Sequence, residues 1–336
     1  MKKITFCFFF TLGTLPNFIM PQQISFSGYG AAGYRFINQI KIIEYNQETY
    51  FKAKFQADIE INEKIDAQID FRGNSEDQRV ELREFSARFS YLDKMQFKFG
   101  NIKKPFGSEQ IENSENLYTI ERSYLAESVA ALGYGGRSIG LTAYYKYSKK
   151  EPGFPHSYYL NAFKDNAEQT GFTGRYIFHF DDFAAAGNYC MLKTSGNFPI
   201  LSHAFSAALT YDIKDFVTET ELFYVQDPIE GIRRIAAGIP DTKVYSLGAR
   251  LLAAVGFDTD GEVIEEIEPL IHLTYFQPDT KISDAHTFQV LFGTNFYFDK
   301  NVRLRLNFDG LLTKNQYSDD YSTHDSRFTI EMQVRF

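Results

Sequence analysis

The sequence contains no tryptophan, only two cysteines and, after its first residues, no long apolar run. A membrane-spanning helix needs about 20 consecutive apolar residues, so any membrane span in the rest of the chain must consist of β-strands. Because Cys7 lies in a segment that we expect to be removed, Cys190 would be the single remaining cysteine, and no internal disulfide is predicted. Without tryptophan, tyrosine and phenylalanine must supply any aromatic girdle at the membrane interfaces.

Basic residues are fewer than acidic ones, 35 against 43, which gives a formal net charge of −8. This acidic excess argues against a nucleic-acid partner. The chain begins with Lys2 and Lys3, followed by a short, Phe-rich apolar run. A charged start before a short apolar core is typical of a secretory signal peptide. We therefore predict a signal peptide over residues 1–23 and one mature domain over residues 24–336.

The last ten residues alternate strictly between apolar and polar side chains. The apolar positions are Phe328, Ile330, Met332, Val334 and Phe336. Successive side chains of a β-strand point to opposite faces, so this segment would have one wholly apolar face and one wholly polar face. The same alternation recurs in residues 49–61, where Lys52 and Lys54 lie on the polar face.

Runs of such alternation predict about sixteen strands. They lie near 24–37, 49–61, 65–72, 81–92, 95–102, 135–147, 157–165, 172–180, 183–193, 203–213, 215–226, 243–256, 266–277, 285–298, 302–313 and 327–336. The longer connections are predicted near 38–48, 73–80, 104–134, 194–202, 227–242 and 314–326, and they alternate with short turns. An even strand count with short turns at one end and long loops at the other is typical of outer-membrane barrels.

A soluble β-sandwich would show a similar alternation. Sixteen long strands, the charged leader and the terminal phenylalanine favour a membrane barrel instead, because only a closed sheet pairs every backbone polar group in lipid. The predicted fold class is therefore all-β, a transmembrane antiparallel β-barrel of about sixteen strands. A barrel of this size encloses a water-filled lumen.

The connection that begins near residue 104 carries the most specific motif. Its members are Gly100, Lys104, Pro105, Phe106, Gly107 and Glu109, followed by the triplet Glu121-Arg122-Ser123. These residues resemble the hallmark of the phosphate-selective porin O and P family. The resemblance implies a sixteen-stranded barrel in the bacterial outer membrane, usually a homotrimer, whose third long loop folds into the lumen and narrows it.

Basic residues near this loop are the candidate ion-binding groups of the constriction and lumen. They are Lys98, Lys103, Lys104, Arg122, Arg88 and Arg35. Arginine binds oxyanions in a bidentate manner and lysine acts as a point charge, and both attract anions strongly in a narrow passage. The alternative is that these are ordinary solvated charges, paired with nearby glutamates such as Glu112 and Glu115.

Other motifs match enzyme signatures but lie in predicted strands. Residues 28–33 fit the dinucleotide fingerprint G-x-G-x-x-G, and residues 136–140 fit the nucleophile elbow G-x-S-x-G. Both signatures require a helix directly after the glycine turn, whereas here the strand alternation continues. The six histidines lack metal-ligand spacing. No cofactor, metal or catalytic residue is therefore predicted.

The predicted function is passive diffusion of small hydrophilic solutes through an outer-membrane porin, with anion or phosphate selectivity as the finer hypothesis. The expected partners are these solutes or anions, membrane lipid and two further copies of the chain. A barrel hydrolase, with its nucleophile and base near Ser138 or His179, is one alternative. A non-conducting structural or adhesive barrel is the other.

Overall fold

The computed structural model describes residues 23–39, 44–92, 94–149, 153–165, 169–314 and 322–336. The predicted signal peptide falls almost wholly outside these residues. The long strands are β1 (Gln23–Gln39), β2 (Glu44–Asn62), β3 (Ile65–Asn74), β4 (Arg79–Leu92), β5 (Met95–Lys103), β6 (Arg137–Tyr145), β7 (His156–Lys164), β8 (Thr170–Phe180), β9 (Phe183–Lys193), β10 (Leu201–Ile213), β11 (Phe216–Gln226), β12 (Tyr245–Val255), β14 (Glu266–Gln277), β15 (His286–Asp299), β16 (Val302–Lys314) and β17 (Ser322–Arg335).

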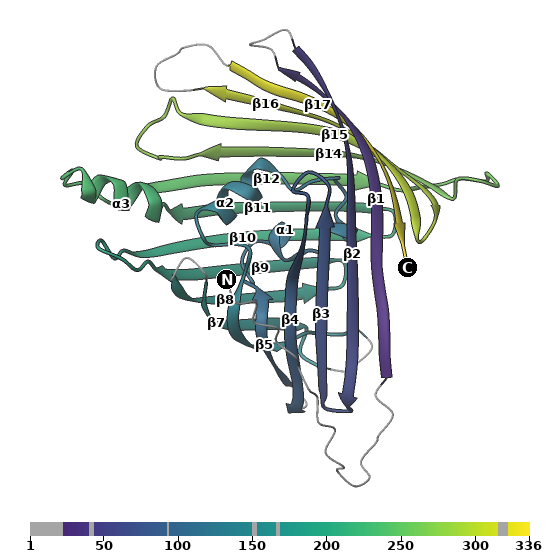
Figure 1. Ribbon diagram of the computed structural model, residues 1–336, viewed down its shortest axis with the longest axis horizontal. Helices are drawn as coiled ribbons and strands as arrows, with labels where there is room; N and C mark the ends of the chain where they lie inside the picture. The colour runs from purple at the N-terminus through teal and green to yellow at the C-terminus, as the bar shows by residue number, and fades with distance from the viewer. Residues whose placement is uncertain (1–22, 40–43, 93, 150–152, 166–168, 315–321) are drawn as a thin grey trace, which may run out of the picture.

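These strands form one closed antiparallel sheet in which each strand pairs with its neighbours along the chain (Figure 1). Pairing of β1 with both β2 and β17 closes the barrel. A seventeenth strand, β13 (Phe257–Asp258), has only two residues and pairs with β14 next to the end of β12. Sixteen strands therefore make the wall, and the predicted fold class is confirmed.

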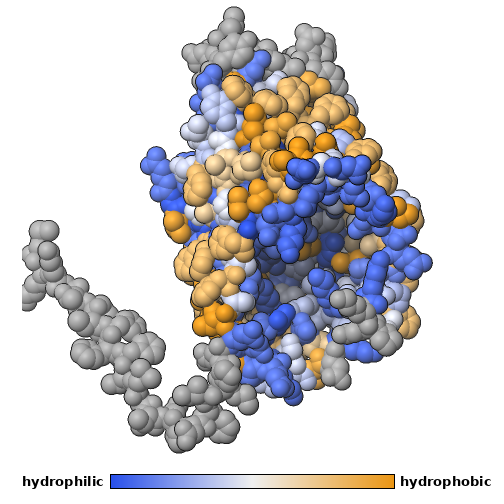
Figure 2. Space-filling model, turned by 90° about the vertical axis from the view of Figure 1, so that its right-hand side faces the viewer, coloured by the Kyte–Doolittle hydropathy of each residue, from blue (hydrophilic) through white to orange (hydrophobic). Residues whose placement is uncertain are grey.

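The two faces of the wall differ as the alternation predicts. Phe26 is 59% exposed on the outside, whereas Lys54, on the adjacent strand and the opposite face, is 5% exposed. Figure 2 shows apolar side chains gathered over the outer wall and hydrophilic side chains around a hollow. The apolar face can thus contact lipid, while the polar face surrounds the lumen.

Two predicted long loops are wrong. The connection expected near 38–48 comprises only residues 40–43, because β1 and β2 remain paired as far as Gln39 and Glu44. The connection expected near 73–80 comprises only Ser75–Gln78, since β3 and β4 pair as far as Asn74 and Arg79. Backbone pairing continues where the apolar alternation has stopped, because ladder hydrogen bonds do not require an apolar face.

Helices occur in the connections. The β5–β6 loop, residues 104–136, contains α1 (Ser108–Ile111), the 3-10 helix η1 (Ser114–Asn116) and α2 (Tyr124–Ala131). Between β11 and β12, α3 (Pro228–Ala236) projects beyond the strands at one end of the barrel (Figure 1). No helix in the described part of the chain is long and apolar enough to span a membrane.

Candidate functional site

The β5–β6 loop is attached to one side of the inner wall by apolar packing. The buried cluster comprises Phe106, Leu125, Val129, Leu132, Tyr134, Phe163, Cys190, Leu192, Ala204, Phe223, Val225 and Phe276. Its strand members occupy positions that would face the lumen, where polar residues are expected. Apolar residues at these positions therefore mark the part of the wall that the loop covers.

Two residues of the family motif form hydrogen bonds between separate parts of the β5–β6 loop. The buried carboxylate of Glu109 accepts hydrogen bonds from the backbone N–H of Ser123 (2.7 Å) and from its hydroxyl (2.6 Å). The Ser123 hydroxyl in turn accepts from the backbone N–H of Ala126 (3.1 Å) and so caps α2. Capping groups of this kind satisfy backbone donors at the start of a helix. The motif thus closes the loop into a defined shape.

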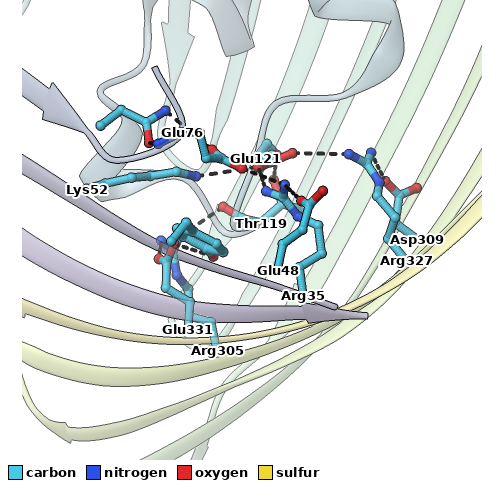
Figure 3. Close-up of polar contacts among 12 residues, drawn as sticks. Arg35, Glu48, Lys52, Glu76, Thr119, Glu121, Arg305, Asp309, Arg327 and Glu331 are labelled. Atoms are coloured by element: carbon cyan, nitrogen blue, oxygen red, sulfur yellow. Dashed lines mark hydrogen bonds and ion pairs between the residues drawn. The ribbon is translucent and has the colours of Figure 1, made fainter. Parts of the chain in front are cut away.

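A third motif residue, Glu121, binds three cations of the wall (Figure 3). Its carboxylate contacts Arg35 of β1, and it lies 3.4 Å from both Lys52 of β2 and Arg327 of β17. Burial alone would raise the pKa of Glu121, but Lys52, Arg35 and Arg327 together hold it below its usual range. Glu121 therefore stays ionised at neutral pH and ties the loop to the seam where β1 meets β17.

Two arginines of β16 hold the middle of the loop through its backbone. Arg303 Nη2 donates to the carbonyl oxygens of Glu115 (2.8 Å) and Leu117 (3.1 Å). Arg305 Nη1 donates to the carbonyl oxygens of Leu117 (3.3 Å) and Thr119 (2.9 Å). Leu117 and Thr119 lie outside helices and strands, and Glu115 lies in the single turn of η1. The arginines therefore supply hydrogen bonds to loop carbonyl groups that regular secondary structure does not satisfy.

A cavity of about 350 Å³ lies between the loop and the wall formed by β1 to β4, β16 and β17. Its cationic lining residues are Lys52, Arg72, Arg79, Arg83, Arg122 and Arg305, and its acidic ones are Asp77, Glu81, Glu121, Glu127 and Glu331. Most of these charges are paired, as in the contacts of Glu81 with Arg79 (3.4 Å) and with Arg83 (3.3 Å).

Arg72 and Arg122 differ from the other cations of this cavity. Among the described residues, Arg122 donates only to the backbone carbonyl oxygens of Glu109 (3.2 Å) and Glu112 (2.6 Å). Arg72 donates to the Ser114 hydroxyl, and its carboxylate neighbours are no closer than 3.7 Å. Its Nε and Nη2 atoms are buried without a hydrogen-bond partner. These two guanidinium groups therefore donate their hydrogen bonds to neutral acceptors and not to carboxylates.

Three other predicted residues support the loop. Arg35 binds Glu121, as described above. Lys103 Nζ donates to the carbonyl oxygens of Ile111 (2.7 Å) and Glu112 (2.9 Å). Lys104 is 3% exposed, and its Nζ donates to the carbonyl oxygen of Gly133 (2.7 Å). Protein atoms cover the Lys104 ammonium group, so we assign this residue to the support of the loop.

The last two predicted residues lie on the wall, away from the 350 Å³ cavity. Lys98 of β5 pairs with Glu84 and donates to Gln68 (3.1 Å). Arg88 of β4 pairs with Asp66 (2.7 Å) near the short turn between β2 and β3. The prediction did not single out Arg72, Arg303, Arg305 or Arg327, because each is one more cation on an alternating polar face. Only the folded loop distinguishes them.

The dinucleotide-like glycines of residues 28–33 lie within β1. A Cβ atom at Gly33 would lie 2.3 Å from the ring of Tyr50, so only glycine leaves room for that ring. The Tyr50 hydroxyl donates to Glu331 (2.8 Å), and the Lys52 ammonium group lies 4.5 Å from the centre of the ring. Gly33 thus accommodates a tyrosine of the inner wall, as small residues in barrel strands often do.

Comparison with protein families distinguishes a porin from other kinds of membrane barrel. The family model of phosphate-selective porin O and P matches residues 32–208, just over half of the 336 residues. The chain belongs to this family. The match includes the β5–β6 loop and the motif that anchors it, and it identifies the protein as a channel of the bacterial outer membrane. A comparison with curated proteins finds no match.

Solved structures share the fold of this porin at low sequence identity. An anion-selective porin from Comamonas acidovorans is 12% identical, with 94% of this chain and 100% of that chain covered and a TM-score of 0.69. The outer-membrane channel DcaP of Acinetobacter baumannii is 8% identical, with 94% and 97% covered and a TM-score of 0.67. OmpF of Salmonella typhi, in complex with daunomycin, is 15% identical, with 94% and 98% covered and a TM-score of 0.63.

Proposed function

We propose that this porin passes small hydrophilic solutes by passive diffusion and favours anions. The observation that carries the proposal is the pair Arg72 and Arg122, which line one cavity from the wall and from the loop. Neither guanidinium group donates a hydrogen bond to a carboxylate, and the nearest carboxylates to Arg72 lie at 3.7 and 3.9 Å. Between low-dielectric walls, such charges raise the local concentration of anions and repel cations.

The acidic net charge of the chain does not oppose this selectivity. Ion preference depends on the charges at the narrowest part of the pore, and many glutamates of this region are already paired with cations. Glu121 and Glu331, for example, contact three and one wall cations respectively. The structural neighbour from Comamonas acidovorans is described as anion-selective, which supports the same proposal.

The β5–β6 loop is the proposed constriction. Its contacts with Arg303 and Arg305 hold it across the polar face of β16, and its apolar cluster holds it against β7, β9, β10, β11 and β14. A solute must then pass beside the loop, so size exclusion and charge selection would occur at the same place. We retain the signal peptide over residues 1–23 and assembly as a homotrimer as parts of the proposal.

We also propose that the barrel is not a hydrolase. Ser138 precedes Ile139, and Ile139 pairs with Lys164 at the C-terminal end of β7. The backbone N–H of His179 donates to the carbonyl oxygen of Pro155, which directly precedes the N-terminal end of β7. About nine strand positions separate these sites, which corresponds to roughly 30 Å. His179 Nε2 instead lies 2.9 Å from the Ser157 hydroxyl, in a pair without a nearby carboxylate partner in the described contacts.

The test is the reversal potential of single channels in a planar bilayer under a KCl gradient. We expect an anion-biased potential that moves toward cation preference in Arg122→Gln and Arg72→Gln. Arg233→Gln is the matched control, because it removes the same charge from α3, where the side chain is 73% exposed and pairs with Glu230. Cation bias in the unmodified protein, or equal potentials in all variants, would contradict the proposal.

A further inference from the structure

A second cavity, of about 410 Å³, lies on the opposite side of the β5–β6 loop. Loop residues between Pro105 and Thr119 cover it, and its wall is formed by β7, β8, β10, β11, β12 and β14. Thr210 lies three residues from the end of β10, at the short turn to β11, and Tyr159 lies three residues from the start of β7 at the same end of the barrel. The second cavity is therefore displaced toward this end, whereas Asn74 and Arg79, which flank the turn Ser75–Gln78, place the first cavity toward the opposite end.

Arg175 of β8 lines this second cavity and forms no ion pair among the described residues. Its guanidinium donates to the Asn188 side-chain oxygen (2.8 Å) and to the Ser108 hydroxyl (3.3 Å), both of which are neutral. Among the described residues, no carboxylate lies within ion-pair distance of it, although Glu221 and Glu219 attract it from farther away. A partly buried cation without a close partner is costly unless an anion binds it.

His272 of β14 supplies a second unsatisfied group at the same cavity. The residue is 3% exposed, lines the cavity, and its Nε2 atom has no hydrogen-bond partner. Buried polar atoms are almost always hydrogen-bonded, so an unpaired ring nitrogen at a cavity wall points to a ligand or ordered water as its missing partner. Arg175 and His272 thus independently mark the cavity as a polar binding site.

The rest of the lining combines polar and charged residues with an apolar and aromatic part that a compact inorganic anion would not contact. Ile177 and Leu252 contribute aliphatic surface, and Tyr118 covers the cavity from the loop. Tyr159 pairs directly with Arg175 across β7 and β8. Its ring stacks on Tyr144 at 5.7 Å with an interplanar angle of 2°, which holds it in place. An aromatic face therefore lies next to the cation of Arg175.

We propose that this cavity is a binding subsite for small organic anions that combine one carboxylate with an aromatic ring. The carboxylate binds Arg175 in a bidentate, charge-assisted manner, and the ring packs against Tyr159 and the aliphatic side chains. The cavity also contains the carboxylates of Glu109, Glu112 and Glu219. A monoanion with an apolar body suits this mixture better than a compact dianion does.

This inference rests on the proposed function, because the subsite is useful only if solutes pass the loop. The test uses the full-length porin in a planar bilayer, with benzoate, acetate and inorganic phosphate added in turn to either side. We expect benzoate to interrupt the current at concentrations at least about tenfold lower than acetate does, since only benzoate has a ring to bury. Arg175→Gln should weaken this block by about tenfold or more, because a hydrogen-bonded charge pair is lost.

Two further variants separate the ring from the charge. Tyr159→Ala should weaken the block by benzoate and leave that by acetate unchanged. Lys214→Gln is the control, because it removes an exposed cation at the same end of the barrel, away from the cavity. If Arg175→Gln does not fold, Thr210→Trp gives a second test, since it fills the cavity from β10 and should abolish the block by benzoate.

The outcomes distinguish the two proposals. Absence of KCl conductance in the folded, unmodified protein would overturn the porin function itself. Normal conductance with equal block by benzoate and acetate would overturn only the subsite, as would a block by benzoate that persists in Arg175→Gln or Thr210→Trp.

Discussion

The contact of Arg305 with the β5–β6 loop permits a quantitative prediction for Arg305→Met. Arg305 and Glu331 form an ion pair in which the side chains are 3% and 1% exposed. Methionine has a similar length and no charge, so the substitution leaves Glu331 with the Tyr50 hydroxyl as its remaining close partner (2.8 Å). Removing one member of a buried ion pair costs about 3–5 kcal/mol, because an uncompensated charge stays buried. We expect a loss of this size in the free energy of unfolding.

The same substitution removes both hydrogen bonds from Arg305 to the loop carbonyl groups, at 3.3 and 2.9 Å. The loop then retains Arg303 but loses one of its two anchors on β16, so its middle section should fluctuate. We expect larger open-channel current noise in planar bilayers. Unfolding in urea can be followed by circular dichroism or tyrosine fluorescence, since the chain has no tryptophan.

The double variant Arg305→Met/Glu331→Gln separates the two effects. It removes the buried charge as well as its partner, so most of the lost stability should return. The carbonyl oxygen of Thr119 still lacks its donor, and that of Leu117 keeps the hydrogen bond from Arg303. We therefore expect nearly normal unfolding together with persistent current noise. If the single and double variants unfold at the same urea concentration, the buried charge is not the cause. Quiet channels in Arg305→Met would refute the role of Arg305 as a loop anchor.

The remaining predictions concern Lys104 and Glu121. Lys104→Met should lower the free energy of unfolding by about 1–3 kcal/mol, because the hydrogen bond to Gly133 is lost, and should leave the reversal potential unchanged. A changed potential would instead place Lys104 in the ion path. Since the pKa of Glu121 is lowered below its ordinary value of 4.5, its contribution to loop attachment should persist above pH 4.5 and decline as the pH falls through the lowered pKa. We therefore expect the current noise of the unmodified protein to rise on acidification and that of Glu121→Gln to be high at all pH values. Noise that is independent of pH in both proteins would contradict this assignment.

The sequence was sufficient to predict the wall of the barrel, because apolar and polar side chains alternate with a period of two residues along each strand. All sixteen predicted strands are confirmed, and β9 and β14 match their predicted ranges at both ends. The faces are also confirmed, as the exposure of Phe26 and Phe51 and the burial of Lys54 illustrate. Lipid on one side and water on the other impose this alternation on every strand, so local sequence alone carries it.

The ends of the strands were predicted less well, for a physical reason. Around Asn38 and Gln47 polar residues occur on both faces of the hairpin, and the alternation no longer marks a strand. The backbone nevertheless pairs from Asn38 with Tyr45 and from Phe36 with Gln47. Outside the membrane both faces can contact water, so pairing can continue without any apolar signal.

The candidate site shows where sequence reasoning reaches its limit. Lys103 and Lys104 are neighbours in the motif, and the prediction treated them alike. β5 ends at Lys103, and the chain then turns so that the Lys104 ammonium group lies 4.4 Å from the centre of the Phe163 ring and 3.5 Å from the Asp165 carboxylate. In the sequence, Arg72 does not differ from any other cation of an alternating strand. In the folded protein the loop places Ser114 against it, while its carboxylate neighbours lie at 3.7 Å or beyond. Charge selection in a pore depends on which cations lack partners after folding, and that depends on contacts between residues far apart in the chain.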